Sequence, residues 1–130
     1  MDLVMSKEAI AGIVRVFDEH LLRSGADCVL LVDQSGNLIV NRGDPSNLDV
    51  VALAALSAAN FGATAEIAKL IGEEDFTLLF HKGKKENIHF SRVGKNYLLI
   101  ILFNKDVSLG LIRLKVSKAL PQILPYLGEE

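Results

Sequence analysis

Apolar residues recur three and four positions apart between residues 6 and 24, which is the spacing of an amphipathic helix. Ser6 is expected to cap the first turn of this helix, and Gly25 to end it. The next segment, residues 27–33, is apolar without alternation, which is typical of a strand covered on both faces. The pattern therefore predicts a helix followed directly by a buried strand.

Four further strands are expected where short apolar runs are separated by turn-forming residues. They cover residues 38–41, 76–81, 87–93 and 97–103, and Gln34-Ser35-Gly36-Asn37 forms the hairpin turn before the first of them. Residues 97–103 are the most apolar of these strands, so they are expected beside residues 27–33 in the centre of one sheet. This placement gives the strand order 2-1-5-4-3 and leaves residues 76–81 at an edge.

Two other segments are predicted to be helical. A long helix is expected from about residue 48 to residue 71, with Ser46 and Asp49 as a capping box. Residues 107–127 are ambiguous, because positions 110–117 alternate as in a strand while the helical spacing of apolar residues persists for longer. We favour the helix, with Pro121 and Pro125 kinking or ending it. The element order α-β-β-α-β-β-β-α is that of an α/β fold with a five-stranded antiparallel sheet.

The composition is that of one globular domain covering residues 1–130. Half of the residues are apolar, and 16 acidic residues nearly balance 14 basic ones. That balance makes nucleic acid an unlikely partner. The charges are unevenly distributed: residues 1–75 hold twelve acids and five bases, and residues 76–130 hold four acids and nine bases.

Three features bear on the cellular location. Cys28 is the single cysteine and lies in an apolar run, so it is expected in the core rather than as a reactive thiol. No apolar stretch reaches the roughly 18 residues of a membrane span. The first residues lack the charged start and apolar segment of a signal peptide. A cytoplasmic protein without a membrane span is therefore predicted.

The long helix has a face of small residues where a solvated face would be charged. On a helical wheel, one side holds Leu53, Leu56, Ile67, Leu70 and Ile71, and this side is expected to pack on the sheet. The other side holds Val51, Ala54, Ala55, Ala58, Gly62 and Ala65, together with Glu66 and Lys69. Small residues let another backbone come close. We expect this second side to bind a partner, the alternative being that another helix of the same chain covers it.

The predicted edge strand favours self-association. Its sequence, Phe76-Thr77-Leu78-Leu79-Phe80, is apolar and contains neither proline nor charge, so an unpaired edge would invite aggregation. Pairing with its own copy across a two-fold axis would cover the edge and bring two long helices together. The prediction is a homodimer of about 28 kDa, twice the 14.2 kDa of one chain.

No catalytic, metal or cofactor site can be recognised in the sequence. Gly83-Lys84-Lys85 lacks the other residues of a phosphate loop and is expected to be a hairpin turn. His81 and His89 lie on adjacent strands and could approach each other, but they have no carboxylate or thiol partner for a metal. No nucleophile is evidently placed beside either histidine. The basic segment 82–95 offers a function of another class, binding of anionic lipid or nucleic acid.

The order and spacing of several segments resemble the Roadblock/LC7 family, and within it the bacterial MglB-like gliding proteins. The segments that carry this resemblance are Val29–Leu38, Val51–Gly72, Phe76–His81, Glu86–Ser91 and Val107–Leu114. The resemblance implies a profilin-like sandwich, with helices on both faces of the sheet, that dimerises through the middle helix and the third strand. It also implies a role beside a Ras-like small GTPase. Dimers of MglB-like members stimulate GTP hydrolysis, whereas other members are scaffolds or motor light chains.

The resemblance also suggests which residues meet these partners. The GTPase is expected to dock at Ala55, Ala58, Gly62, Ala65, Glu66 and Lys69, with Ala58 and Gly62 foremost. The dimer interface is expected at Ala59, Ala63, Phe76, Leu78 and Phe80. The protein would then select the hydrolysis-competent arrangement of the GTPase switch loops and supply no catalytic centre of its own. Arg42 and Arg92 are candidates for an arginine finger, although their spacing singles out neither.

Overall fold

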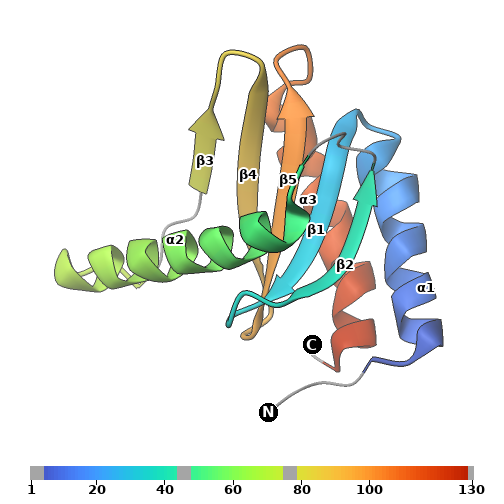
Figure 1. Ribbon diagram of the computed structural model, residues 1–130, viewed down its shortest axis with the longest axis horizontal. Coiled ribbons are helices and arrows are strands. Elements are labelled where there is room, and N and C mark those ends of the chain that lie inside the picture. The colour runs from blue at the N-terminus through green and yellow to red at the C-terminus, as the bar shows by residue number, and fades with distance from the viewer. Residues whose placement is uncertain (1–4, 44–47, 75–78, 129–130) are drawn as a thin grey trace.

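The computed structural model describes residues 5–43, 48–74 and 79–128 (Figure 1). One five-stranded sheet carries helices on both of its faces. The helices are α1 (Lys7–Val16), α2 (Val50–Leu70) and α3 (Leu109–Ile123), with a π-helical segment η1 (Phe17–Leu22) after α1 and a 3-10 turn η2 (Leu124–Leu127) after α3. The strands are β1 (Ala26–Asp33), β2 (Leu38–Gly43), β3 (Leu79–Lys82), β4 (Glu86–Val93) and β5 (Tyr97–Asn104).

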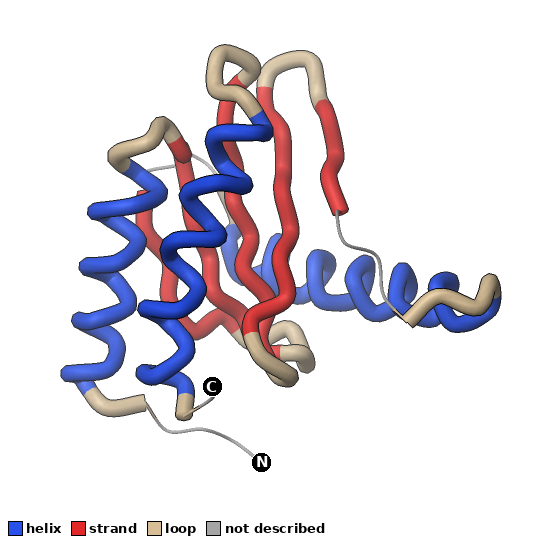
Figure 2. The backbone as a smooth tube through the Cα atoms, turned by 180° about the vertical axis from the view of Figure 1, so that it is seen from behind, coloured by secondary structure: helices blue, strands red, loops and turns tan. Residues whose placement is uncertain are grey.

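The strands are antiparallel in the order β2-β1-β5-β4-β3, which confirms the predicted order. The two most apolar strands, β1 and β5, lie in the centre. α1 and α3 cover one face of the sheet, and α2 crosses the other face (Figures 1 and 2). Leu31 and Leu99 belong to the core under α1 and α3, whereas Leu30 and Ile100 belong to the core under α2. The profilin-like sandwich is therefore confirmed in its element order and its layers.

Cys28 lies in the core on the α2 side, as predicted. Burial, together with the neighbouring charge of Asp27, raises the pKa of the Cys28 thiol to about 11. Such a thiol is not ionised near neutral pH, so Cys28 is a packing residue.

Each long helix begins at a side-chain cap. Ser6 and Ser108 each accept a hydrogen bond from the amide three residues further on, both at 3.1 Å. Asp49 caps α2, because its Oδ1 accepts from the Ala52 amide at 3.0 Å. The predicted capping box of Ser46 with Asp49 is wrong, since Asp49 is itself the N-cap residue. Ser46 lies outside the described residues.

The ambiguous C-terminal segment is helical, as favoured from its longer period. α3 buries Ile112, Val116, Ala119 and Ile123. Pro121 lies inside α3 without ending it, and the chain continues into η2.

The prediction of which side of α2 faces the sheet was wrong. The buried residues of α2 are Ala54, Ser57 and Ala68. Of the five large aliphatic residues expected on the sheet, Leu53 is half-buried against the core under α2. The other four are instead exposed, by 70% for Leu56, 53% for Ile67, 86% for Leu70 and 65% for Ile71. Apolar residues occur all around α2, so the pattern alone cannot identify the buried side. In addition, the C-terminal half of α2 extends beyond β3, past the edge of its own sheet (Figures 1 and 2).

α2 also corrects the expectation that no segment is long and apolar enough to span a membrane. An 18-residue window of α2 has a mean hydropathy of 1.5 and is only 11% buried, so the helix meets the length and composition of a membrane span. Its apolar run is interrupted by Ser57, Asn60 and Thr64, but it contains few charges. Because one side of α2 packs on β1 and β2 through Ala54, the feature that needs explaining is the exposed side.

Candidate functional site

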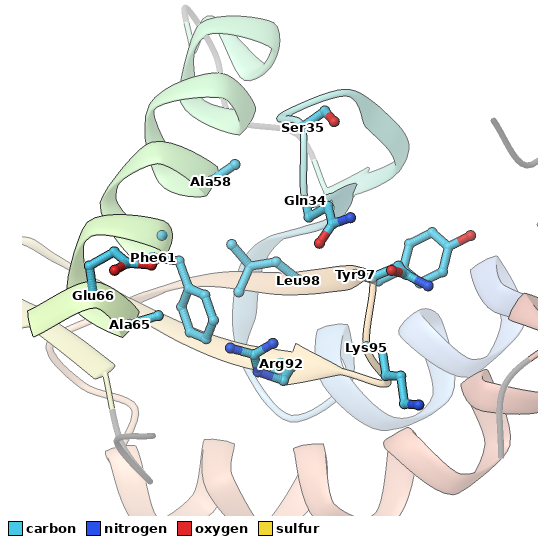
Figure 3. A pocket seen from close by; sticks show the side chains of 12 residues that line it. Gln34, Ser35, Ala58, Phe61, Ala65, Glu66, Arg92, Lys95, Tyr97 and Leu98 are labelled. Carbon is cyan, nitrogen blue, oxygen red and sulfur yellow. The ribbon is translucent and has the colours of Figure 1, made fainter. Parts of the chain in front are cut away.

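A pocket of about 380 Å³ lies between α2, the β1–β2 turn and the β4–β5 turn (Figure 3). Twelve residues line it: Gln34, Ser35, Ala58, Phe61, Gly62, Ala65, Glu66, Arg92, Lys95, Asn96, Tyr97 and Leu98. Four of these, Ala58, Gly62, Ala65 and Glu66, belong to the residues predicted to bind a partner. The structure therefore joins part of the predicted surface to two turns that the sequence did not connect with it.

The β1–β2 turn forms one wall of this pocket and is held by Asp33. Asp33 Oδ1 accepts hydrogen bonds from the Ser35 amide at 3.0 Å and the Asn37 amide at 2.9 Å, and Oδ2 accepts from Asn37 Nδ2 at 3.0 Å. Partial desolvation raises the pKa of Asp33, but the hydrogen bonds from residues 35–37 outweigh it and keep this pKa below its ordinary value. The turn is therefore a fixed wall near neutral pH.

Gly36 allows this turn to lie against α2. Its φ is +92°, a backbone conformation that other residues adopt rarely. A Cβ at this position would also lie 3.0 Å from the Cα of Ala55. The small residues of α2 therefore allow close packing against the β1–β2 turn, in addition to forming an exposed surface.

Arg92 and Phe61 form the opposite wall. The guanidinium carbon of Arg92 lies 5.1 Å from the centroid of the Phe61 ring, within the range of a cation–π contact. Figure 3 shows the Arg92 side chain turned toward Phe61, whereas Lys95 points away from α2. Arg92 follows Ile88 and Phe90 on the α2 side of β4, so it occupies a position where the alternation of the strand calls for an apolar residue. That exception was the sequence signal for this wall.

The exposed surface of α2 consists of two neighbouring strips. The docking strip contains the residues predicted to bind the GTPase: Ala55, Ala58, Gly62, Ala65, Glu66 and Lys69. The outer stripe is larger and more apolar, and contains Ala52, Leu56, Ala59, Ala63, Ile67 and Leu70. The helical period places the docking strip between the buried side of α2 and the outer stripe.

Within the docking strip, Gly62 is an open position. A Cβ added there would meet no described heavy atom within 4 Å. Ala58 and Ala65 are half-buried, whereas Ala55 is exposed. Lys69 Nζ donates to Glu66 Oε1 at 3.2 Å, which is an exposed pair one helical turn apart. The strip is thus a small apolar surface with one ion pair at its end.

The residues predicted for the dimer interface are divided among several places. Ala59 and Ala63 are exposed in the outer stripe. Phe80 is half-buried and stacks on Phe103 of its own chain, with 6.1 Å between the ring centroids. Phe76 and Leu78 lie outside the described residues. β3 pairs with β4 and has no second partner strand in the described part of the sheet, so it is an edge strand there as predicted.

The two histidines do not meet, contrary to the possibility raised from the sequence. Phe80 pairs with His89 and His81 with Ile88, so the two imidazoles lie on opposite faces of the sheet. The His81 ring contacts Phe90 edge-on, with 5.5 Å between the centroids. Within the described ranges, no group of three potential ligand side chains is arranged to hold a metal ion.

His89 has a polar neighbour that was not predicted from the sequence. Ser91 Oγ lies 2.9 Å from His89 Nε2, whereas Nδ1 is buried and has no hydrogen-bond partner among the described residues. Burial, and secondarily the positive charge of Arg113, lowers the pKa of His89 to about 4. In the described ranges no carboxylate is bonded to Nδ1, so the His89–Ser91 pair lacks the third group of a catalytic triad there.

We expect His89 to destabilise the fold in acid. The unfolded chain takes up a proton at the ordinary histidine pKa, but the native state does so only near pH 4, so stability falls below about pH 6.5 by up to roughly 2–3 kcal/mol. Urea unfolding of the wild type and of His89→Leu, each near pH 7 and near pH 4, measures this contribution. The gap in unfolding free energy between the two proteins should change by that amount. A gap independent of pH would contradict the expectation.

The two arginines considered as fingers lie on opposite faces of the sheet. Arg42 forms a two-pronged ion pair with Asp18, with Nε–Oδ1 and Nη2–Oδ2 both at 3.0 Å. Its cross-strand partner Val29 belongs to the core under α1. Arg92 is therefore the arginine of the two that lies beside the docking strip.

The sequence model of the Roadblock/LC7 domain family matches residues 13–103. The structure of MglB from Myxococcus xanthus is 37% identical over 97% of this chain and 95% of its own, with a TM-score of 0.87. The gliding protein MglB from Thermus thermophilus is 28% identical over 99% and 98%, with a TM-score of 0.89. A further MglB structure, described as a tetrameric arrangement, is 28% identical over 96% and 94%, with a TM-score of 0.88. The similarity thus extends over nearly the whole fold.

Proposed function

The chain belongs to the Roadblock/LC7 domain family, and from that premise we propose that it is a homodimeric regulator that stimulates GTP hydrolysis by a Ras-like small GTPase. Its similarity to MglB supports a regulator of the MglB type. The observation that carries the proposal is the docking strip: an open, small-residue surface beside a pocket with one rigid polar wall and one cationic wall.

The docking strip suits close approach by a folded partner. At Gly62 nothing within the described residues fills the space that a side chain would occupy, so a partner backbone or side chain can reach the helix surface there. Next to it, the pocket offers the apolar side chains of Phe61 and Leu98, with Arg92 at its rim. Six of the twelve lining residues are polar or charged, so the pocket offers a partner both apolar contact and several hydrogen-bonding groups.

The proposed action is on the partner's conformation. GTP hydrolysis requires a phosphate cradle, bound Mg²⁺ and an oriented water, all of which the GTPase carries. The Gly83-Lys84-Lys85 segment that resembles a phosphate loop closes the β3–β4 hairpin, where the Gly83 amide donates to the Glu86 carbonyl at 3.0 Å. The regulator would favour the hydrolysis-competent arrangement of the switch loops by binding it more tightly. If an arginine contributes directly, Arg92 is the one on the correct side.

The homodimer is proposed from the outer stripe. Leu56, Ile67 and Leu70 are all more than half exposed on one side of α2. Such an apolar surface would promote aggregation of a free monomer. A second copy of the same stripe would cover it, and the β3 edges beside the two helices could pair at the same time. A dimer interface would account for the high hydropathy of α2 without a bilayer. One side of the helix packs on its own sheet, and the exposed apolar side would pack on the second copy.

The function is tested by single-turnover GTP hydrolysis with the Ras-like GTPase encoded nearest to this gene. Addition of the protein is expected to accelerate hydrolysis by at least about tenfold, equivalent to about 1.4 kcal/mol of barrier. Intrinsic hydrolysis by the GTPase alone gives the baseline. Binding without acceleration would replace the activating role by that of a scaffold, and absence of binding would overturn the proposal.

A further inference from the structure

Six basic side chains lie on or beside the face of the molecule opposite to α2. They are Lys82, Lys84 and Lys85 at the β3–β4 turn, Lys105 in the β5–α3 loop, and Arg113 and Lys118 on α3. All six are exposed. We refer to them as the basic patch.

The fold brings these residues together from three segments. The Lys105 amide donates to the Lys85 carbonyl at 3.3 Å, so the β3–β4 turn and the β5–α3 loop touch. Both connections lie side by side at the top of the molecule in Figures 1 and 2, and α3 descends from that point. Lys82 pairs with Asn87, and Phe80, the next residue on the same face of β3, packs in the core under α3. The basic patch therefore extends from the β3–β4 turn and the adjoining β5–α3 loop onto the exposed side of α3.

Exposed leucines accompany these charges. Leu111 is 38% and Leu114 is 50% exposed, and both lie on α3 among the basic residues. α3 contains no acidic residue. An amphipathic helix that presents basic side chains and exposed leucines together is typical of attachment to the surface of a bilayer. A nucleic-acid surface would instead be expected to carry interleaved aromatic residues, and α3 has none.

Three acidic residues of the described chain lie beside the basic patch. Asp106 follows Lys105 directly, Glu86 begins β4, and Asp27 is hydrogen-bonded to Glu86. Burial, with a hydrogen bond and charge from Asp27, raises the pKa of Glu86 to about 7, so this carboxyl group is only partly ionised near neutral pH. The local charge is therefore positive in a molecule whose net charge is −2.

We propose that the basic patch, with Leu111 and Leu114, attaches the protein to an anionic lipid surface. The lysine and arginine side chains would lie at the level of the lipid headgroups, and the two leucines would enter the interface between headgroups and acyl chains. The sheet separates this surface from α2, so the docking strip and the outer stripe remain accessible. The attachment is independent of the proposed GTPase function, and either can fail without the other.

The test is sedimentation of the full chain with lipid vesicles. Vesicles of phosphatidylcholine mixed with phosphatidylglycerol are expected to bind the protein, and vesicles of phosphatidylcholine alone are not. Arg113→Glu combined with Lys118→Glu is expected to weaken binding by at least about 25-fold, at roughly fivefold for each cation lost. Binding should also fall as the salt concentration rises. Leu111→Ser combined with Leu114→Ser leaves the charge unchanged. This variant should nevertheless bind the anionic vesicles more weakly than the wild type at the same salt concentration.

A matched control changes the same number of charges in the same helical layer. Lys7→Glu combined with Arg15→Glu alters two exposed residues of α1 and should retain vesicle binding within a few fold. Equal losses in both double variants would show that net charge alone is responsible, and would overturn the assigned surface. Absence of sedimentation with anionic vesicles, or tighter binding of duplex DNA than of vesicles, would overturn the lipid proposal. Circular dichroism verifies that each variant is folded.

Discussion

Gly62→Arg is expected to weaken binding of the GTPase by more than about 100-fold while the regulator keeps its fold. In the free protein the new side chain has room, because no described heavy atom lies within 4 Å of a Cβ at this position. Arginine is also a better helix former than glycine, so the free energy of unfolding should rise slightly, by up to about 1 kcal/mol. In the complex, the added bulk and the burial of an unpaired charge cost several kcal/mol. A loss of about 2.7 kcal/mol already corresponds to 100-fold in the dissociation constant.

The matched control is Gly110→Arg. Gly110 is also a helical glycine, with no described heavy atom within 4 Å of a Cβ built there, but it lies in the first turn of α3, on the other face of the sheet. Titration calorimetry with the GTPase should therefore show binding close to that of the wild type for Gly110→Arg. Equal binding by Gly62→Arg and the wild type would show that the GTPase does not bind at the docking strip. Equal loss in both variants would indicate a general effect of added charge.

Ala58→Arg is a less selective probe of the same surface. Ala58 is half-buried, and its Cβ lies 3.6 Å from the position that a Cβ on Gly36 would occupy. An arginine at this position would press on the β1–β2 turn as well as on a partner. Loss of binding by Ala58→Arg alone would therefore not locate the partner, and Gly62 is the better position.

The layered fold could be predicted from sequence because its signals are local. Continuous apolar runs at β1 and β5 require burial on both faces, which places these strands in the centre and determines the strand order. Ser6 and Gly25 mark the ends of the first helical segment by their own chemistry. The cap of α2 was assigned wrongly because Ser46 and Asp49 are both good capping residues, and the choice between them depends on where the chain turns.

The orientation of α2 could not be predicted because periodicity reports burial only when one side of a helix is polar. A helical wheel does not distinguish the small residues packed against the β1–β2 turn from the exposed aliphatic residues, because both groups are apolar. The assumption that the larger residues face the core failed, since the buried positions of α2 hold the small residues Ala54, Ser57 and Ala68. The two strips were distinguishable only once the tertiary contacts of α2 were known.

The candidate site was only partly accessible to sequence reasoning, because pockets join residues that are distant along the chain. Ala58 and Gly62 were found from their spacing within one helix. Gln34 and Asn96 lie in two separate turns that reach the same pocket through the pairing of β1 with β5. The approach of Arg92 to Phe61 likewise depends on how α2 crosses β4. The charge on the apolar side of β4 is the sequence signal that could have indicated this contact.

Leu56→Asp combined with Ile67→Asp is expected to convert the proposed homodimer into a folded monomer. Both side chains are more than half exposed in the single chain, so aspartate there should change the stability of the monomer by little more than helix propensity, under about 1 kcal/mol for each residue. In an isologous dimer each substitution occurs twice. Four carboxylates would therefore be placed in an apolar contact, at a cost that exceeds a thousandfold loss in affinity, about 4 kcal/mol.

Light scattering during size-exclusion chromatography measures the outcome of that substitution. The wild type should have a mass of about 28 kDa, and the double variant the 14.2 kDa of one chain. Leu114→Asp is the control, because Leu114 is also half exposed but lies on α3, away from the outer stripe. It should leave the mass of the dimer unchanged. A wild-type mass of one chain at every concentration would refute the homodimer, whereas a double variant that stays dimeric would place the interface elsewhere, at the β3 edge alone or on the α1–α3 layer.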